Sequence, residues 1–243
     1  MNEHDGQPGQ LVLLGDFHVH STFSDDAVST IAENIAAAHD RGLTQLRLID
    51  HVRQSTTWVP EFVAAVAGHD VPEGLTVFTG VEAKILNAAG EVDIPPALSG
   101  LDAIVIADHQ FPGIDGPWAP DEVRNRLAGG WGVTDAVDML VSALIAAMDS
   151  TPDAQLAHCF SILPKIGLDE SDLTDEHLRA WASAAARTGT IVEVNEKWAC
   201  PGPRAIRAAI VAGATIVAAS DAHIFSDVGR YRRVVDIVDE AVG

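Results

Sequence analysis

Histidine and carboxylate side chains stand at the ends of short apolar runs throughout this chain of 243 residues. Imidazole and carboxylate groups together bind zinc, manganese and iron, and metal-bound water is a nucleophile for hydrolysis. In a protein interior the same groups would be costly unless they were paired or shared a metal ion. The pattern therefore predicts a hydrolase that holds two or three divalent ions. The residues that carry this prediction are His18, His20, His51, Glu82, His109, His158, Asp221 and His223.

The runs that precede these residues have the length and composition of buried β-strands, and helical patterns separate them. The predicted strands cover residues 11–20, 44–51, 75–83, 102–109, 154–159, 190–195 and 214–223. The predicted helices cover residues 30–41, 60–68, 134–149, 174–188, 203–213 and about 230 to the end. Repeated strand–helix units indicate a parallel α/β fold, either a closed β/α barrel or an open doubly wound sheet. None of the predicted strands is followed by a glycine-rich nucleotide-binding pattern.

Spacing within the strands places the polar groups on one face. Residues two apart in a strand point to the same side of the sheet. Asp16, His18 and His20 have this spacing, and so do Glu193 and Asn195. In β/α barrels the active site forms where the carboxyl ends of the strands meet. We therefore expect these polar residues to converge there, while the apolar residues between them face the helices.

The composition restricts the partners and the compartment. The formal net charge is -20, which repels nucleic-acid backbones and argues against a nucleic-acid partner. The two cysteines, Cys159 and Cys200, do not make a disulfide framework. The start, MNEHDGQPGQ, lacks the basic and apolar regions of a secretory signal, and no apolar run is long enough to span a membrane. We expect a cytoplasmic protein with a polar tail at residues 1–10 and one domain at residues 11–243.

At the polar strand ends the sequence resembles the PHP (polymerase and histidinol phosphatase) family of metal-dependent phosphoesterases. The motifs DFHVHSTFSDD, IDH, GVE, ADH, AHC, VEVN and SDAH appear in order between residue 14 and about residue 232. The fold of the family is a distorted barrel of seven strands and seven helices. The resemblance therefore implies a single-domain distorted (β/α)7 barrel of the PHP type.

The resemblance also implies how the ligands would be shared among the ions. One ion would be held by His18, His20, Glu82 and Asp221. A second ion would share Glu82 and would be bound also by His109 and His158. A third ion would be held by His51, His223 and an acidic residue of the SDD stretch.

That acidic residue is Asp26 or its neighbour Asp25. Asp26 follows the second histidine of the first motif by six residues, which is the spacing of the phosphatase members. Other branches of the family use a spacing of five, which would select Asp25. Phosphatase members often have histidine at this position, so the filling of the third site and its metal preference stay open. Zinc, manganese and iron all suit such mixed ligands.

Other residues in the motifs would support the ligands. Asp16 would orient a ligand imidazole, or else bond to the backbone at the start of its strand. Glu193 and Asn195 match the EVN motif of the family and would line the pocket or support ligands. Cys159 directly follows His158 and is expected to be a small core residue rather than a nucleophile.

Phosphate recognition requires positive side chains near the strand ends. The candidates are Arg53, Lys84, Lys165, Lys197 and Arg230, each of which would otherwise be a solvated surface charge. Arg53 and Lys197 are favoured, and an arginine is especially suited to bidentate phosphate binding.

The segment QFPGIDGPWAP after His109 is either a lid over the site or a connection with Trp118 packed beneath it. Trp58 and Trp198 also follow ligand-bearing strands, where an organic leaving group would be within reach.

The combined interpretation is a phosphoric monoester hydrolase that acts on a small phosphorylated substrate, histidinol phosphate being one substrate of the family. A hydroxide held between two ions would attack phosphorus without a side-chain nucleophile, and basic residues would neutralise the phosphate oxygens. The first alternative is a phosphodiesterase or exonuclease that acts on nucleotides. The second is hydrolysis of a carbon–nitrogen or ester bond by the same metal centre, as in amidohydrolases. A barrel without catalysis, retained as an interaction module, is the third.

Overall fold

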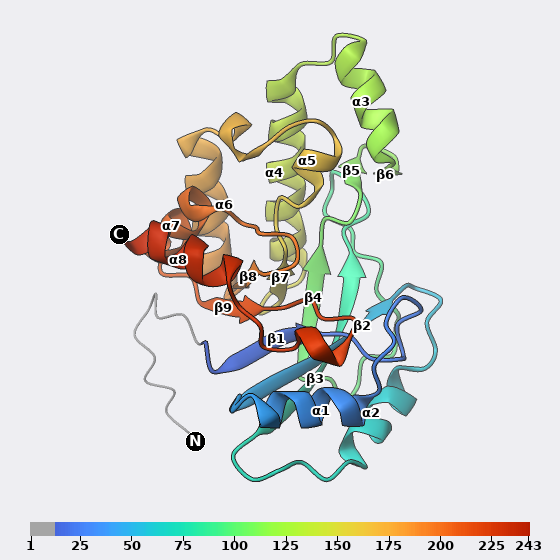
Figure 1. Cartoon of the computed structure of the whole chain (residues 1–243). Helices are drawn as coiled ribbons and strands as arrows, with labels where there is room; N and C mark the ends of the chain where they lie inside the picture. Colours follow the sequence, from blue (N-terminus) through green and yellow to red (C-terminus); the bar gives the residue numbers. More distant parts are fainter. Residues whose placement is uncertain (1–12) are drawn as a thin grey trace.

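Seven parallel strands form the centre of the fold, as the computed structural model shows for residues 13–243 (Figure 1). Their order in the sheet is β1-β2-β3-β4-β7-β8-β9. The predicted tail, residues 1–10, and the first residues of the predicted strand 11–20 lie outside this range. The strands are β1 (Gly15–Val19), β2 (Gln45–Val52), β3 (Thr76–Lys84), β4 (Ala103–Ala107), β7 (Gln155–Ala157), β8 (Ile191–Asn195) and β9 (Ile216–Ala219).

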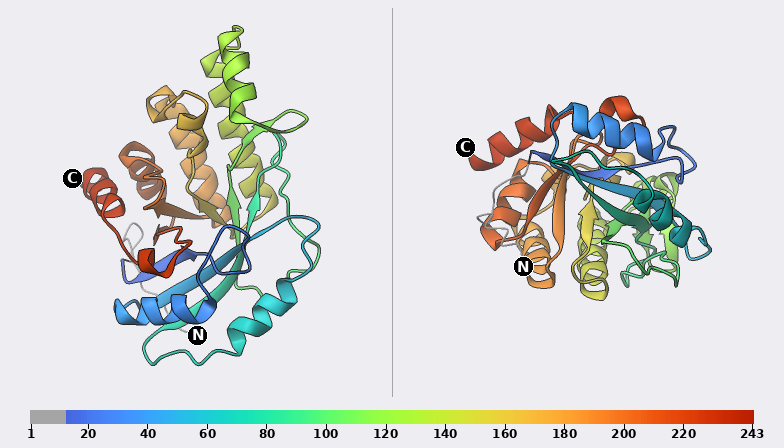
Figure 2. Two further views of the ribbon diagram at one scale, coloured as in Figure 1. Left: turned by 45° about the vertical axis from the view of Figure 1, so that its right-hand side comes forward. Right: turned by 90° about the horizontal axis from the view of Figure 1, so that it is seen from below.

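The two outer strands of this sheet meet and nearly close it into a barrel. Val19, at the end of β1, pairs in parallel with Ala222, just beyond β9. The His20 amide donates to the Ala222 carbonyl at 2.9 Å. Figure 2 shows the helices arranged around the outside of the strands. The structure thus confirms the distorted barrel rather than an open doubly wound sheet.

Helices connect the strands and cover the outer face of the barrel. The larger ones are α1 (Ile31–Asp40), α2 (Val59–Ala67), α4 (Val133–Ser150), α6 (Asp175–Thr188), α7 (Pro203–Ala212) and α8 (Arg233–Val242). The predicted capping box begins α1: the Thr30 hydroxyl accepts from the Glu33 amide at 3.2 Å, and the Glu33 carboxylate accepts from the Thr30 amide at 2.8 Å. Two glycines in left-handed conformation, Gly189 and Gly213, end α6 and α7 as predicted.

The interior of the barrel contains a small apolar layer below its carboxyl end. Ile49, Val105, Ala107 and Ala157 form one fully buried cluster. They come from β2 and from the neighbouring strands β4 and β7, and because β3 separates β2 from these two, the contacts of Ile49 with the others run through the interior. A column of buried polar side chains, from His18 through Glu193 to Gln155, also lies inside the barrel.

The segment after β4 contains elements that the sequence pattern did not predict individually. A short hairpin, β5 (Phe111–Gly113) and β6 (Gly116–Trp118), precedes helix α3 (Pro120–Ala128), and a one-turn helix, α5 (Ile162–Lys165), follows β7. Trp118 is only 7% exposed and packs on Phe111 at 5.9 Å and on Trp131 at 5.8 Å. Of the two interpretations of this segment, the packed connection is the one observed.

Candidate metal centre

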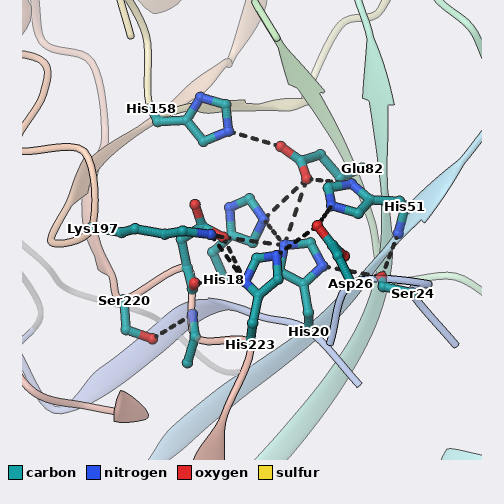
Figure 3. A network of polar contacts seen from close by, with 12 residues as sticks. His18, His20, Ser24, Asp26, His51, Glu82, His158, Lys197, Ser220 and His223 are labelled. Carbon is teal, nitrogen blue, oxygen red and sulfur yellow. Dashed lines mark hydrogen bonds and ion pairs between the residues drawn. The ribbon is translucent and has the colours of Figure 1, made fainter. Parts of the chain in front are cut away.

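Histidines and carboxylates of β1, β2, β3, β4, β7 and β9, or of the loops that follow these strands, converge at the carboxyl end of the barrel, and most of them are labelled in Figure 3. His18, His51 and Glu82 lie within β1, β2 and β3, and Asp26 lies in the loop after β1. The other members follow the last residue of their strands by one to four positions: His20, His109, His158, Asp221 and His223. Parallel strands end at the same edge of the sheet, so short overhangs of this kind meet at one point. The residues brought together are His18, His20, Asp26, His51, Glu82, His109, His158, Asp221 and His223.

The carboxylate of Glu82 is the centre of the cluster. Its Oε1 lies 2.9 Å from His109 Nε2 and 3.0 Å from His158 Nε2. Its Oε2 lies 2.9 Å from His51 Nδ1, and further imidazole nitrogens approach it from β1, at 3.4 Å (His18) and 3.6 Å (His20). Five imidazoles therefore surround one carboxylate that is only 1% exposed. A carboxylate placed in this way can bridge two cations.

The spacing of the donor atoms fits divalent ions. Ligand atoms about 2.1 Å from a tetrahedral zinc ion lie roughly 3.4 Å from one another. His18 Nε2 and His20 Nε2 are 3.0 Å apart, and His20 Nε2 is 3.3 Å from Asp221 Oδ1. Glu82 Oε2 is buried, and no protein group in the described part of the chain satisfies it with a well-directed hydrogen bond. A buried anionic oxygen facing imidazole nitrogens is what a cation would complete.

The side chains form three groups, and within each group the ligand atoms lie within 4.8 Å of one another. The first agrees with the ion implied by the resemblance and contains His18, His20 and Asp221. The others are His51 with Glu82 and His109, and His51 with His20 and His223. His51 thus lies between the second and third implied ions, whereas the resemblance placed it with the third alone.

Asp25 and Asp26, the two candidates for the acidic residue of the third group, differ in their contacts with the imidazoles. Asp26 Oδ2 lies 3.2 Å from His223 Nε2 and 3.6 Å from His51 Nε2. Asp25 is exposed and lines two cavities beside His51. Of the two neighbouring carboxylates, Asp26 is therefore the one in contact with both imidazoles.

Protons and cations compete for this cluster. Burial lowers the pKa of His20 to about 3, so this imidazole is neutral and ready to bind a cation. Burial also disfavours a charged His158, but hydrogen bonds to Asp108 and Glu82 reverse the effect and raise its pKa to about 10. Burial would raise the pKa of Glu82, yet the charges of the surrounding histidines hold it well below its usual range. Glu82 is therefore anionic, and a bound cation would displace protons from its imidazole partners.

Two serine–aspartate pairs, which the sequence analysis missed, orient ligand imidazoles. The Ser24 hydroxyl donates its one proton to Asp50 at 2.6 Å. In its contact with His20 Nδ1 at 3.2 Å, the hydroxyl oxygen is therefore the acceptor and the imidazole N–H the donor. Ser161 has the same arrangement, with Asp108 at 3.3 Å and His158 Nδ1 at 3.2 Å. In both histidines the Nδ1 atom carries a proton and Nε2 faces the cluster. The signal in sequence was an aspartate directly before each strand-end histidine in IDH and ADH.

Glu193 supports the cluster from the inner wall. Its carboxylate accepts from His18 Nδ1 at 3.0 Å and from the His158 amide at 2.8 Å. Asn195 donates to the same carboxylate at 2.8 Å and accepts from the Trp198 amide at 2.9 Å. These contacts place both residues behind the imidazoles.

Asp16 is placed differently from the first of its two predicted roles. Its carboxylate accepts from the backbone amides of His18 at 3.3 Å, Ser220 at 2.9 Å and Gly229 at 2.8 Å. Within the described residues these bonds tie β1 to the segment after β9, and they go to backbone rather than to an imidazole. The prediction that Asp16 orients a ligand ring is therefore corrected to backbone support, because the ring of His18 reaches Glu193 instead.

Basic side chains border the cluster on two sides. Lys197 Nζ lies 3.5 Å from Asp221 Oδ1 and 3.2 Å from His223 Nδ1, and it lines a cavity of about 220 Å3 over the cluster. Lys165 lines the same cavity, with its ammonium 4.0 Å from the centre of the Trp198 ring. Trp198 also donates to Asp221 Oδ2 at 2.8 Å.

On the other side, Arg53 lines two cavities of about 300 Å3 each that both include His51. Lys84 lines one of them and donates to Gln110 at 2.8 Å. Arg230 lines a cavity of about 340 Å3 beside His223, so all the predicted phosphate candidates lie around the cluster. Trp58 lines a cavity with Arg53 and packs on Phe23 at 5.3 Å.

Two residues of the cluster have left-handed backbone conformations. The φ angles are 26° for His158 and 54° for Asp221. Such conformations cost about 1–3 kcal/mol for residues other than glycine and are found preferentially at functional sites. Cys159, between His158 and the core, is fully buried, and burial raises the pKa of its thiol well above the usual range. It packs as a core residue, as predicted.

Comparisons with known proteins agree with this geometry. The PHP domain model matches residues 16–197. A protein named a probable phosphatase from Shewanella sediminis is 27% identical over 245 residues, covering 95% of this chain and 87% of that protein. Another so named, from Vibrio parahaemolyticus, is 35% identical over 99 residues, which is only 39% of its own length.

A crystal structure of a histidinol phosphate phosphatase from Lactococcus lactis, complexed with zinc, L-histidinol and phosphate, has the same fold. Its TM-score is 0.61, with 13% sequence identity and 93% of each chain covered. In residues 13–243 there is no helix with the length and apolar character needed to cross a lipid bilayer. The family model covers most of the chain, including most of the strand-end motifs, and the chain therefore belongs to the PHP domain family.

Proposed function

We propose that this protein is a metal-dependent phosphatase that hydrolyses a small phosphomonoester. The observation that carries the proposal is the convergence of five imidazoles on the buried carboxylate of Glu82, with basic side chains on both sides. The names of the relatives and of the structural neighbour support phosphate as the group removed.

The protein residues would bind and orient the ions and the substrate. His18, His20 and Asp221 would hold one ion, and Glu82 would link it to a second held with His109 and His158. The third group would be His51, Asp26 and His223. Divalent ions at these positions supply a water nucleophile with a pKa near 7 and neutralise charge on the phosphate. Zinc, manganese and iron all suit the ligands.

The basic residues would receive the phosphate oxygens that the ions leave free. Lys197 is held at the edge of the cluster by Asp221 and His223, and Arg53 lies at the opposite side next to His51. Two positive groups on opposite sides orient a small dianion between them. The net charge of -20 disfavours a long nucleic acid as the substrate. We also propose a cytoplasmic location, consistent with two buried, unpaired thiols.

The test begins with protein stripped by a chelator and reloaded separately with manganese, zinc and iron. Phosphate release is measured from a panel of phosphomonoesters, with diesters, amides and esters assayed in parallel. We expect metal-dependent release from monoesters that His20→Ala abolishes, while the matched variant His39→Ala, on the exposed side of α1, retains it. Turnover of diesters alone, or of amides alone, would replace the proposal by the corresponding hydrolase. Stoichiometric metal with no turnover would indicate a barrel without catalysis.

A further inference from the structure

A column of polar side chains runs down inside the barrel from the metal centre to the amino-terminal ends of the strands. His18 is at the top, Glu193 and Gln155 follow, and Arg47 is at the base. The first three are 0%, 0% and 1% exposed. Arg47 lies near the start of β2, whereas Gln155 begins β7. Since β3 and β4 separate these strands in the sheet, the bond between the two side chains crosses the barrel interior.

The upper half of the column orients His18. Both oxygens of Glu193 face N–H donors whose positions are fixed, which is the arrangement expected around a carboxylate. An ionised carboxylate can only accept, so His18 Nδ1 must carry a proton and Nε2 must face the other ligands. Glu193 in turn accepts from Gln155, His158 and Asn195, which hold it in this position.

The lower half of the column decides which way the Gln155 amide points. A glutamine side chain has one accepting and one donating end, and the two look alike in shape. The guanidinium of Arg47 has donors only, so it selects the Oε1 end of Gln155. The Nε2 end is then turned to Glu193 and to the Phe17 carbonyl, both of which are acceptors. With the amide reversed, oxygen would face carboxylate and NH2 would face guanidinium, and both contacts would be repulsive.

Stability alone does not explain an arginine at this position. Burial lowers the pKa of Arg47 to about 10, which reports the free energy lost by removing its charge from water. Its Nε is buried and has no hydrogen-bond partner within residues 13–243. The guanidinium also lies 5.1 Å from the Phe17 ring, and the nearby charges of Asp102 and Glu193 offset only part of the cost of burying it.

We propose that Arg47 is a remote positioning residue for the metal centre, acting through the orientation of Gln155 on Glu193 and hence on His18. This inference rests on the proposed metal site, and it adds a residue from the opposite end of the barrel to the machinery. Outer partners of metal-binding histidines commonly change metal affinity by about 10–100-fold when removed. Arg47 is two hydrogen bonds further from the ion than Glu193, the direct partner of His18, so its removal should weaken metal binding by about 10-fold, the lower end of this range.

The experiment measures the dissociation constant of zinc by competition with a chromophoric chelator, using the full chain. We expect Arg47→Met to weaken zinc binding about 10-fold and Arg47→Lys, which keeps a charged donor, to stay within about threefold of wild type. Gln155→Met breaks the column in the middle and should weaken binding at least about 10-fold. The matched control is Arg207→Met, which removes a guanidinium that donates to the Ala241 and Glu240 carbonyls, remote from the column.

The double variant Arg47→Met/Gln155→Met separates a relay from two independent effects. In a relay, loss of Gln155 removes the route by which Arg47 acts, so the double variant should bind zinc within about twofold of Gln155→Met. Fully additive losses would overturn the inference. So would wild-type affinity in Arg47→Met, whatever its loss in unfolding stability relative to Arg207→Met. A wild-type protein that takes up no metal would refute the proposed function itself, and the inference with it.

Discussion

The most informative single substitution is Glu82→Gln, which replaces an anionic oxygen by an amide without changing the shape of the side chain. Glu82 contacts imidazoles from β1, β2, β4 and β7 at 2.9–3.6 Å and is 1% exposed. It is the residue shared by the first and second proposed ions. The amide keeps one oxygen but turns an NH2 donor toward imidazole nitrogens and cations.

The size of the effect follows from the affinity of the ions. Removal of an outer partner costs up to about 100-fold in metal affinity, so removal of a shared anionic ligand should cost at least that. At a zinc concentration 100 times the wild-type dissociation constant, binding stabilises the wild type by about 2.7 kcal/mol. The same concentration would stabilise the variant by about 0.4 kcal/mol or less. For a chain of this length these values correspond to increases in Tm of about 5–11 °C and about 1–2 °C.

The assay is thermal unfolding of chelator-treated protein with and without zinc, followed by circular dichroism. Glu122→Gln is the matched control, because Glu122 is on the exposed face of α3, where it pairs with Arg126. It should retain the full zinc-dependent increase. An increase in Glu82→Gln equal to that of the wild type would refute the assignment of Glu82 as the shared ligand.

Three further predictions concern particular residues. Asp26→Asn should lower the number of bound ions per chain by one, as measured by elemental analysis, because Asp26 contacts the imidazoles of the third group. Asp25→Asn should leave that number unchanged, and the reverse result would assign the site to Asp25. Cys159→Ala should retain phosphate release, since the thiol is fully buried and burial raises its pKa. Loss of turnover in a variant that still binds metal would show a chemical role for the thiol. Gly90→Ala should lower the free energy of unfolding, measured in urea, by at least about 2 kcal/mol, because φ is +75° and a Cβ would lie 2.3 Å from the Ala147 backbone nitrogen. An unchanged midpoint of the urea transition would refute that packing.

The strand–helix order could be predicted because each buried strand carries its own apolar signature. All seven predicted strands are present, and the capping box at Thr30 and the glycine ends of α6 and α7 are observed. The hairpin β5–β6 could not be predicted in the same way. It is only three residues long in each strand, too short for a periodic pattern, and both Phe111 and Trp118 pack on Trp131 outside the hairpin.

The candidate site was predictable to the extent that its residue types repeat at strand ends. The choice between Asp25 and Asp26 was not, because neighbouring residues in a loop point in unrelated directions until the loop is placed against His223. The role of Asp16 was misjudged in one of its two interpretations for a related reason. Its alternation with His18 shows a shared face, but only the three-dimensional structure shows that the nearest donors are backbone amides of the segment after β9.

The sequence by itself determined the order of strands and helices along the chain, the kinds of polar side chain and the ends of the strands at which they stand, since all of these follow from local periodicity and residue chemistry. The tertiary structure decided which side chains meet around Glu82, which ring nitrogens of His18, His20 and His158 face the cluster, and how Arg47 connects to His18 through Gln155 and Glu193. These properties depend on contacts between strands that are far apart along the chain. Glu82 meets imidazoles from both sides of the barrel only when the sheet closes, and the column from Arg47 to His18 exists only because closure creates an interior to cross.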